Sequence, residues 1–422
     1  MNQMDADVII AGAGPAGCIA AYELAKQGFH ILILEKSIFP RYKVCGGGLT
    51  HKIIKEIPFD LSAVIEATIH SIQFSSNFKD IFTRTSVYPL MYCTMRENLD
   101  AFLLRQAVLA GARIEFQQQV VAVNHESRGV WISTKSGSYK AKMIIGADGP
   151  SSIVARLSGL RSNIELGIAW EAEILTEPGI LDKYSDTVFL DWGTFPGGYG
   201  WVFPKKDHFS IGVGGPARLS KQMMPYYNKF LEYLDFGSSR QPAIDRHQPL
   251  VSNQHPITLS LKSWPIPVKT KKGDFHSERA LVVGDAAGLT DSLTGEGIYY
   301  AVVSGKMAAS SCNDFLLGKS DTLKSYSDRV NDELMEELLE GVKIKNMFNT
   351  VPLKIHRFVR DNDRAWGAFG KILRGERGYK DVKHGFGKWK IFWNLVTFLS
   401  RFIEKRNENR FRRNLMPKYN KE

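Results

Sequence analysis

Three glycines near the start of the chain have the spacing of a phosphate-binding turn. Gly12, Gly14 and Gly17 form the pattern GxGxxG directly after a short β-branched apolar run, and the segment that follows has helical character. In this pattern the first glycine permits a tight turn, the second lets the backbone approach a pyrophosphate, and the third allows close helix–strand packing. The helix N-terminus adds unpaired N–H groups and a favourable dipole, so the segment predicts a site for the phosphates of a dinucleotide.

A carboxylate in a suitable position strengthens this interpretation. The second apolar run, Ile31 to Leu34, ends at Glu35, where a side chain can hold both hydroxyls of a ribose. Strand, tight turn, helix and strand in this order open a doubly wound α/β domain. A glycine turn that serves packing alone is the alternative, and the two strands together with Glu35 disfavour it.

Two later segments indicate that the dinucleotide is FAD and not NAD. Gly284 and Asp285 follow a buried strand, where the aspartate can accept hydrogen bonds from ribityl hydroxyls. The segment Gly295 to Ile298 places a second flexible stretch of backbone where an isoalloxazine ring could be approached closely. With the segment Ala147 to Gly149 in the middle of the sequence, these motifs resemble those of the flavoprotein superfamily that contains aromatic hydroxylases and geranylgeranyl reductases.

Three segments resemble the geranylgeranyl reductase family in particular. Pro40 to Gly48 is similar to that family's P-R-x-K-x-C-G-G segment, and Tyr199 to Lys205 is similar to its YxWxFPK motif. Gly284 to Ile298 is similar to its GDAAG…GEGI segment, with Ser292 where many members carry proline. That departure bears on the rigidity of the loop and the rim of the pocket. The resemblance extends over roughly the first three quarters of the chain, and the C-terminal part shares only its helical and basic character.

The resemblance implies an FAD that lies extended between the first glycine turn and the GD segment. It also implies that Arg96 contacts the flavin and that the backbone of Val120 contacts the adenine. The residues expected to bind the cofactor are Gly12, Gly14, Ala16, Gly17, Glu35, Lys36, Arg41, Cys45, Gly46, Gly47, Gly48, Arg96, Val120, Asp285, Gly295, Gly297 and Ile298. The cysteines have no metal-ligand spacing, and no metal is expected.

Aromatic residues of the YxWxFPK segment are candidates for the substrate pocket. Reduction of an isolated trisubstituted alkene requires a hydride at one carbon and a proton at the other, in a pocket that holds the alkene against the reduced flavin and keeps water away. Tyr199, Trp201 and Phe203 share one face of a strand. The family motif favours Tyr199 and Trp201 as pocket residues, whereas Phe203 is expected to pack in the core.

Cys45 lies in the glycine-rich loop expected near the flavin and is the candidate catalytic residue. Its thiol could tune the ring, donate a proton, or simply fit where space is short, because a free cysteine is commonly a small buried hydrophobe. We hypothesise that Cys45 contacts the flavin. Cys18, Cys93 and Cys312 are expected to be packing residues.

The order of the segments predicts the domain organisation. The expected fold class is α/β, with a Rossmann-like FAD-binding domain, an inserted antiparallel β-sheet substrate domain and a helical C-terminal region. Residues 114–123 and 129–134 are expected as strands of a small antiparallel insert within the first domain. The FAD-binding domain is assigned to 1–164, with a small excursion into the substrate domain at about 56–92, and to 275–330; the substrate domain is 165–274 and the basic helical region 331–422.

The composition is that of a folded globular protein. The chain has 422 residues, 44% hydrophobic and 23% charged, which leaves no case for disorder. Four widely separated cysteines argue against a disulfide framework and for a reducing compartment. The N-terminus enters a strand without a signal-peptide pattern, and no apolar stretch reaches the roughly 18 to 20 residues of a spanning helix. We expect a cytoplasmic protein.

Positive charge is concentrated near the C-terminus. The net charge is +11, and residues 341–422 contain 21 Lys or Arg against 7 Asp or Glu. Residues 388–405 predict an amphipathic helix flanked by cations, the pattern of an interfacial membrane contact, although a helix packed on the enzyme body fits equally well. A prenyl substrate resides in a bilayer and favours a peripheral contact with the cytoplasmic membrane surface. Nucleic acid is not expected as a partner, since no recognition module occurs.

The sequence is therefore interpreted as an FAD-dependent reductase that saturates C=C bonds of a polyprenyl, geranylgeranyl-type chain on a lipid, quinone or tetrapyrrole-linked substrate. NADPH, NADH or a small redox carrier could donate the electrons, since there is no separate nicotinamide-binding glycine motif. Monooxygenases and halogenases share the fold, but the YxWxFPK and CGG segments favour the reductase. A flavin electron-transfer protein without a substrate of its own is the alternative from another class.

Overall fold

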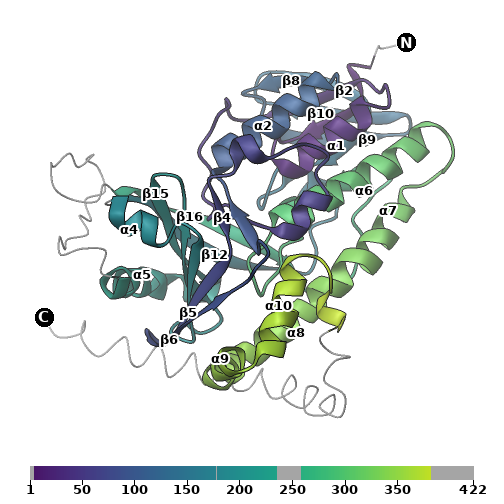
Figure 1. Cartoon of the computed structure of the whole chain (residues 1–422). Coiled ribbons are helices and arrows are strands. Elements are labelled where there is room, and N and C mark those ends of the chain that lie inside the picture. Colours follow the sequence, from purple (N-terminus) through teal and green to yellow (C-terminus); the bar gives the residue numbers. More distant parts are fainter. Residues whose placement is uncertain (1–3, 177, 235–257, 382–422) are drawn as a thin grey trace, which may run out of the picture.

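The computed structural model describes residues 4–176, 178–234 and 258–381. These residues form two large β-sheets, a small third sheet between them, and helices that cover both (Figure 1). The predicted fold class, an FAD-binding α/β domain with an inserted antiparallel sheet and a helical C-terminal region, is confirmed.

The first sheet carries the glycine turn at the end of its central strand. Its strands, in order across the sheet, are β8 (Arg113–Phe116), β2 (Ile31–Glu35), β1 (Ala6–Ala11), β11 (Ser138–Gly146), β10 (Gly129–Thr134) and β9 (Val120–Glu126), with β17 (Ala280–Val282) paired to the end of β11. The strands β8, β2, β1, β11 and β17 run parallel. β1 and β2 are continuous buried apolar runs, as a parallel sheet covered on both faces requires.

Three helices cover the face of this sheet next to the turn. They are α1 (Pro15–Ala25), α2 (Arg96–Leu109) and α6 (Ile298–Leu316), and α1 packs against both of the others (Figure 1). The contact between α1 and α6 is close because a Cβ atom on Gly305 would lie 2.5 Å from the carbonyl oxygen of Ala16. On the other side of the turn, α3 (Ile153–Leu157) contacts β9, β11 and β17.

The predicted antiparallel insert was partly wrong. Residues 114–123 do not form one strand, because β8 ends at Phe116 and β9 begins at Val120. β8 pairs in parallel with β2 and only β9 and β10 form an antiparallel hairpin. The break lies at Gln117, whose φ of 62° is in the left-handed region that strands do not adopt.

The second sheet is the inserted one. Its strands, in order, are β16 (Thr258–Lys269), β12 (Ile164–Leu175), β15 (His208–Pro216), β14 (Tyr199–Pro204), β13 (Thr187–Trp192), β5 (Ser71–Ser76) and β6 (Lys79–Thr85). All neighbours are antiparallel except β13 and β5. β5 and β6 lie within the excursion assigned to 56–92. Two helices accompany the sheet, α4 (Pro178–Lys183) and α5 (Ser220–Leu234), and the small third sheet consists of β3 (Gly48–Thr50), β7 (Met91–Cys93) and β4 (Ala67–Ile69).

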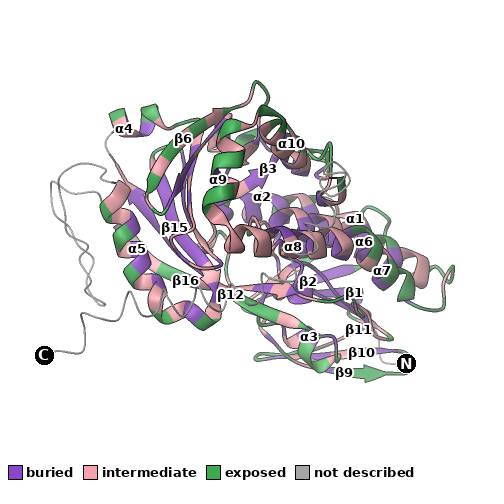
Figure 2. Cartoon of the chain, turned by 90° about the horizontal axis from the view of Figure 1, so that it is seen from below, coloured by how far each residue is buried: buried purple, intermediate pink, exposed green. Residues whose placement is uncertain are grey.

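The C-terminal helices pass from the first domain to the edge of the second sheet. They are α7 (Lys324–Arg329), α8 (Glu336–Thr350), α9 (Pro352–Asp361) and α10 (Asp363–Leu373), with one π-helical turn (Val330–Met335) before α8. α9 contacts β5 and β6, and Figure 2 shows its outer face exposed. No helix within the described ranges is long and apolar enough to cross a bilayer. The amphipathic helix predicted for 388–405 lies outside the described residues.

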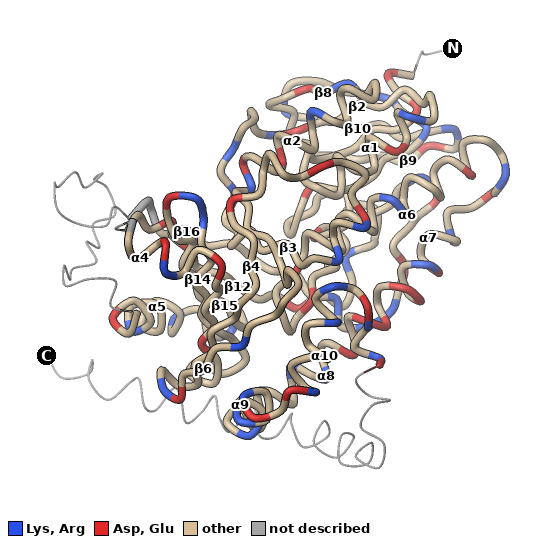
Figure 3. The backbone as a smooth tube through the Cα atoms, viewed as in Figure 1, with Lys and Arg blue, Asp and Glu red and all other residues tan. Residues whose placement is uncertain are grey.

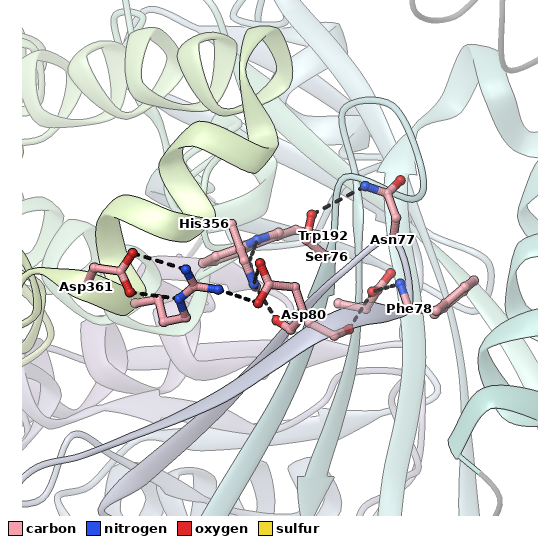
Figure 4. A network of polar contacts seen from close by, with 10 residues as sticks. Ser76, Asn77, Phe78, Asp80, Trp192, His356 and Asp361 are labelled. Atoms are coloured by element: carbon pink, nitrogen blue, oxygen red, sulfur yellow. Dashed lines mark hydrogen bonds and ion pairs between the residues drawn. The ribbon is translucent and has the colours of Figure 1, made fainter.

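His356 fastens α9 to the second sheet (Figure 4). Its side chain is fully buried; Nδ1 accepts a hydrogen bond from the indole N–H of Trp192 at 2.8 Å, and Nε2 is 2.6 Å from the carbonyl oxygen of Asp80. Because an indole N–H can only donate, the imidazole proton is on Nε2 and is donated to that carbonyl. Arg360 adds an ion pair with the Asp80 carboxylate at 2.5 Å. These contacts hold α9 against a strand that lines the candidate site described below.

Replacement of His356 by leucine tests this attachment. The indole N–H of Trp192 and the carbonyl of Asp80 lose their partner in a buried setting, so we expect a loss of stability of about 1–3 kcal/mol. The measurement is the urea midpoint of the purified protein. The matched control is His30→Leu, since the side chain of His30 is 90% exposed. Equal midpoints for the two variants would mean that α9 is held by apolar contacts alone.

Candidate active site

One cavity lies between the two large sheets and receives side chains from both. Its volume is about 2840 Å³, and the C-terminal helices α8 to α10 form part of its wall. Of the residues predicted to bind cofactor or substrate, it is lined by Gly12, Gly14, Ala16, Glu35, Lys36, Arg41, Cys45, Gly46, Gly47, Gly48, Arg96, Val120, Asp285, Gly295, Gly297, Ile298, Tyr199 and Trp201. The remaining one, Gly17, lies behind the turn.

The three glycines of the first turn differ in what surrounds them. Gly12 has a φ of 103°, and a Cβ atom there would lie 2.4 Å from the carbonyl oxygen of Ala147, so the turn can pass β11 only without a side chain. A Cβ on Gly17 would lie 2.1 Å from the carbonyl oxygen of Gly12, which explains its role in packing. Gly14 is different, because no described atom beyond its chain neighbours lies within 4 Å of the position its Cβ would take. This space lies in front of the N-terminus of α1.

Glu35 holds the glycine turn in place. Its carboxylate accepts the backbone N–H of Ala13 at 2.8 Å through Oε2 and that of Ser37 at 2.9 Å through Oε1. The residue is only 4% exposed, yet it lines the cavity. Each carboxylate oxygen has a second lone pair, so the same side chain can accept hydroxyl protons from a ribose.

Two arginines share one buried aspartate at the wall of the cavity. Arg96 makes a bidentate ion pair with Asp100, in which Nε and Nη2 each lie 2.8 Å from a carboxylate oxygen. Nη2 of Arg41 lies 3.0 Å from the same carboxylate, which is fully buried. Nη1 of Arg41 is also buried and has no hydrogen-bond partner among the described residues. A buried cationic donor of this kind requires an acceptor, and a phosphate or flavin oxygen would supply one.

The second glycine segment presents another helix N-terminus. Asp285 begins a tight turn after β17, and its Oδ1 accepts the hydroxyl of Thr290 at 3.4 Å. Gly297 precedes the first residue of α6, and none of the described side chains caps that helix. Gly295 has a φ of 72°, and the hydroxyl of Tyr199 would lie 2.8 Å from its Cβ. The backbone at Gly295 and Gly297 carries no side chains, so a planar ring could lie close against it.

The loop from Cys45 to Gly48 crosses between the two sheets. A Cβ atom on Gly46 would lie 2.5 Å from the ring of Phe203, and one on Gly47 would lie 1.8 Å from the carbonyl oxygen of Thr94. The half-buried Cys45 donates its backbone N–H to Glu171 at 2.9 Å, and its thiol interacts with the guanidinium of Arg96. The prediction for Phe203 was right in part, since its ring packs against the buried cluster of Ile69, Cys93 and Val188. Because the loop carries no side chains at these glycines, the ring reaches the cavity and lines it beside Trp201.

Sequence reasoning missed Glu171. This residue on β12 is fully buried and lines the cavity, where its carboxylate accepts the indole N–H of Trp201 at 3.3 Å as well as the N–H of Cys45. Burial and the nearby Glu173 carboxylate raise the pKa of Glu171 to about 7, although the Lys205 ammonium acts in the opposite direction. The available signal was two glutamates at i and i+2 in an otherwise apolar strand, WEAEIL.

The three packing cysteines fit their prediction. Cys18, Cys93 and Cys312 are fully buried, and burial raises the pKa of each thiol. They are therefore unreactive in the folded state. All four cysteines of the chain are free.

Comparisons with known proteins agree with this geometry. A family model described as an FAD binding domain matches residues 5–211. Digeranylgeranylglycerophospholipid reductase 1 of Methanopyrus kandleri is 30% identical, covering 83% of this chain and 92% of its own, and an uncharacterised protein of Methanosarcina barkeri is 32% identical over 83% and 86%. The crystal structure of a geranylgeranyl bacteriochlorophyll reductase-like protein from Thermoplasma acidophilum has a TM-score of 0.70 at 24% identity, covering 82% of this chain and 87% of its own.

The fold and the cavity are those of an FAD-dependent oxidoreductase. Within that class, the chain belongs to the geranylgeranyl reductase family. The residues present fit the cofactor, because an open turn at Gly14, two uncapped helix N-termini and the unsatisfied Nη1 of Arg41 all face one cavity.

The open space at Gly14 gives a direct test of the cofactor site. We expect Gly14→Leu to fold normally, since nothing described lies within 4 Å and the φ of −75° suits any residue, but to lose FAD affinity by about 100-fold because the side chain fills the phosphate position. The measurements are circular dichroism for folding and flavin absorbance after titration with FAD. The matched control is Gly179→Leu, an exposed glycine with equally open surroundings. Undiminished FAD binding by Gly14→Leu would place the phosphates elsewhere.

Proposed function

We propose that the chain uses FAD to saturate carbon–carbon double bonds in a polyprenyl chain of geranylgeranyl type. The observation that carries this proposal is the single cavity that joins the glycine turns to an apolar wall. Its volume of about 2840 Å³ exceeds the roughly 300–1000 Å³ of a pocket for one small ligand. The cavity therefore has room for a dinucleotide and a long apolar chain together.

The wall away from the glycine turns suits a hydrocarbon. Its apolar lining residues come from the second sheet and from the C-terminal helices, and include Ile72, Val188, Leu190, Trp192, Phe195, Met347, Phe348, Phe358, Phe369 and Ile372. An isoprenoid has no hydrogen-bonding groups, so burial of its surface, at about 25 cal/mol per Å², provides its affinity. The acceptor of the prenyl group is a lipid, a quinone or a tetrapyrrole in this proposal.

The cofactor and the protein make different contributions to the reaction. FAD, once reduced, supplies a hydride. In this proposal Gly14, Arg41 and Asp285 hold the dinucleotide, and Tyr199 and Trp201, which line the same cavity, face the alkene. These rings exclude water and orient the alkene, which is the main contribution a protein can make to such a transfer. We propose NADPH, NADH or a small redox carrier as the electron donor.

We also propose a peripheral membrane contact. The cavity reaches the surface at α9, where Leu353 and Phe358 are exposed. Lys354 and Arg357 are their neighbours in the sequence, and Figure 3 shows basic positions on this helix. Apolar side chains with cations around them suit the interface of an anionic bilayer. The amphipathic segment 388–405 would extend the same contact.

The function is tested by mass spectrometry of lipid and quinone extracts from a host supplied with geranylgeranyl compounds. We expect a gain of two hydrogens per saturated bond with the unaltered protein and none with Gly14→Leu, because the hydride comes from bound FAD. Purified protein with reduced FAD and a geranylgeranyl compound should give the same product. Oxygen insertion or halogenation of test substrates would instead indicate a monooxygenase or halogenase, and flavin turnover with quinones alone would indicate an electron carrier.

Vesicle flotation tests the membrane contact. We expect the full chain to float with anionic vesicles at low salt and to detach as salt rises, because surface charges are screened over about 10 Å at 0.1 M. Replacement of Leu353 and Phe358 by serine should weaken flotation, whereas Leu109→Ser, at the exposed end of α2, should not. Equal flotation by all three proteins would remove α9 from the contact.

A further inference from the structure

Two buried glutamates lie two residues apart on β12, and Glu171 lacks the cationic partner that usually accompanies such a group within the described residues. Glu171 is fully buried and Glu173 is 3% exposed, and their side chains point to the same face of the strand. A buried carboxylate is costly unless it is paired, and no arginine or lysine forms an ion pair of 4.0 Å or less with Glu171 within the described part of the chain. The ammonium of Lys205, whose charge acts on Glu171, donates to the carbonyl of Gly46 at 2.5 Å instead.

Glu171 lies between a residue predicted to bind the cofactor and one predicted to line the substrate pocket. It is bonded to the backbone of Cys45 on one side and to the indole of Trp201 on the other, and all three residues line the cavity. Because its pKa is about 7, the carboxyl exists in both protonation states near neutral pH. A group that can give and regain a proton under these conditions is suited to general acid catalysis.

Glu173, whose charge acts on Glu171, has contacts that reach the surface. Its Oε1 accepts the hydroxyl of Tyr42 at 3.4 Å, and its Oε2 accepts the hydroxyl of Ser210 and lies 3.2 Å from Nε2 of His208. Nδ1 of His208 lies 2.6 Å from Asp207, whose side chain is 76% exposed. Burial lowers the pKa of His208, but the two carboxylates raise it more, so the net shift is upward. Titratable groups thus lead from solvent to Glu173, which lies two residues from Glu171 on the same face of β12.

We propose that Glu171 donates the proton of alkene reduction and that Glu173 and His208 return a proton to it from solvent. This inference rests on the proposed prenyl reduction. The π bond of the alkene breaks, one carbon forms a C–H bond with the hydride of reduced flavin, and the other forms a C–H bond with the proton of the Glu171 carboxyl. The flavin is left oxidised and Glu171 is left as a carboxylate, which one solvent proton neutralises.

Cys45 acquires a different role in this scheme. Its backbone N–H holds Glu171 at 2.9 Å, so it positions the acid, and its thiol is not required for the proton. Tyr227 on α5 is influenced by both glutamates, and Lys262 lies opposite Glu171 in the β12–β16 register. The charged and titratable groups that face Glu171 are therefore Glu173, Lys205, Tyr42, Cys45, Tyr227 and Lys262.

The test compares the unaltered holoenzyme with Glu171→Gln, which keeps the size of the side chain and can still accept one of the two hydrogen bonds through its amide oxygen. Flavin absorbance first establishes that FAD is bound. The rate of one turnover is then followed, from reduced enzyme and a geranylgeranyl compound, between pH 5 and 9. We expect Glu171→Gln to lower this rate by about 100-fold or more. The rate of the unaltered enzyme should fall as pH rises through about 7, where Glu171 loses its proton, and the residual rate of the variant should be flat.

A second readout needs no substrate. Difference infrared spectroscopy of the holoenzyme should show a buried protonated carboxyl that titrates near pH 7 and is absent from Glu171→Gln. Glu173→Gln and His208→Gln should slow the steady state more than the first turnover, because they act on the return of the proton. The matched control is Glu232→Gln, an exposed carboxylate on α5 of the same domain, with unchanged rate and spectrum.

The possible outcomes distinguish a failure of the proposed proton transfer through Glu171 from a failure of the proposed prenyl reduction. If the unaltered enzyme saturates a prenyl chain and Glu171→Gln does so at the same rate and with the same pH profile, proton donation by Glu171 is overturned. The proposed function as a prenyl reductase is then retained. A Cys45→Ser variant that loses the first turnover while Glu171→Gln keeps it would assign the proton to the thiol. If the unaltered enzyme reduces no prenyl compound, the proposed function is overturned. Proton donation from Glu171 to an alkene is then overturned with it.

Discussion

The close approach of the loop Cys45–Gly48 to the second sheet is the constraint on which the rest of the site depends. The ring of Phe203 occupies the space where a side chain of Gly46 would be, and the ammonium of Lys205 is bonded to the carbonyl of the same glycine. The carboxylate of Glu171 accepts the backbone N–H of Cys45, the residue before Gly46. Three contacts within two residues of the loop therefore join the dinucleotide domain to the inserted sheet. Any side chain at Gly46 would separate them and widen the cavity where the two reacting parts must meet.

A second set of contacts joins the same cavity to the C-terminal helices. Asp291, buried in the loop before α6, accepts the hydroxyl of Tyr379 at 2.5 Å and that of Thr294 at 2.6 Å. Lys52 pairs with Glu296 in the same loop at 2.7 Å. Since Gly295 and Gly297 belong to this loop, its shape depends on residues more than 80 positions away in the sequence. The helices after α6 are thus a structural part of the site and not an appendage to it.

The parts of the site that the sequence predicted are those whose geometry is local. The spacing of Gly12, Gly14 and Gly17 determines a turn, and the end of a neighbouring parallel strand determines where Glu35 lies, so a few residues of context suffice. The function of Glu171 depends instead on which strand is its neighbour and on which loop lies above it. The contacts with Cys45 and Trp201 span 126 and 30 positions, and no periodicity within β12 reveals them. The contact of Phe203 with the cavity was missed for the same reason, because it follows from the absence of side chains in a loop more than 150 positions earlier. The division of residues 114–123 into two strands likewise depends on strand pairing, since β8 pairs with β2 and β9 pairs with β10.

A buried carboxyl beside the flavin cavity also bears on which chemistry this fold performs. Monooxygenation and halogenation need oxygen at the reduced flavin, whereas saturation of an unactivated alkene needs a proton at a dry carbon atom. Glu171 lies in surroundings that favour its neutral form, and the indole of Trp201 and the backbone of Cys45 fix its orientation without an ion pair. An arginine in place of either partner would hold the carboxyl charged and make it useless as an acid near neutral pH. The same burial that makes the glutamate costly for stability therefore makes it suitable for the step that a reductase requires and the related oxygenases do not.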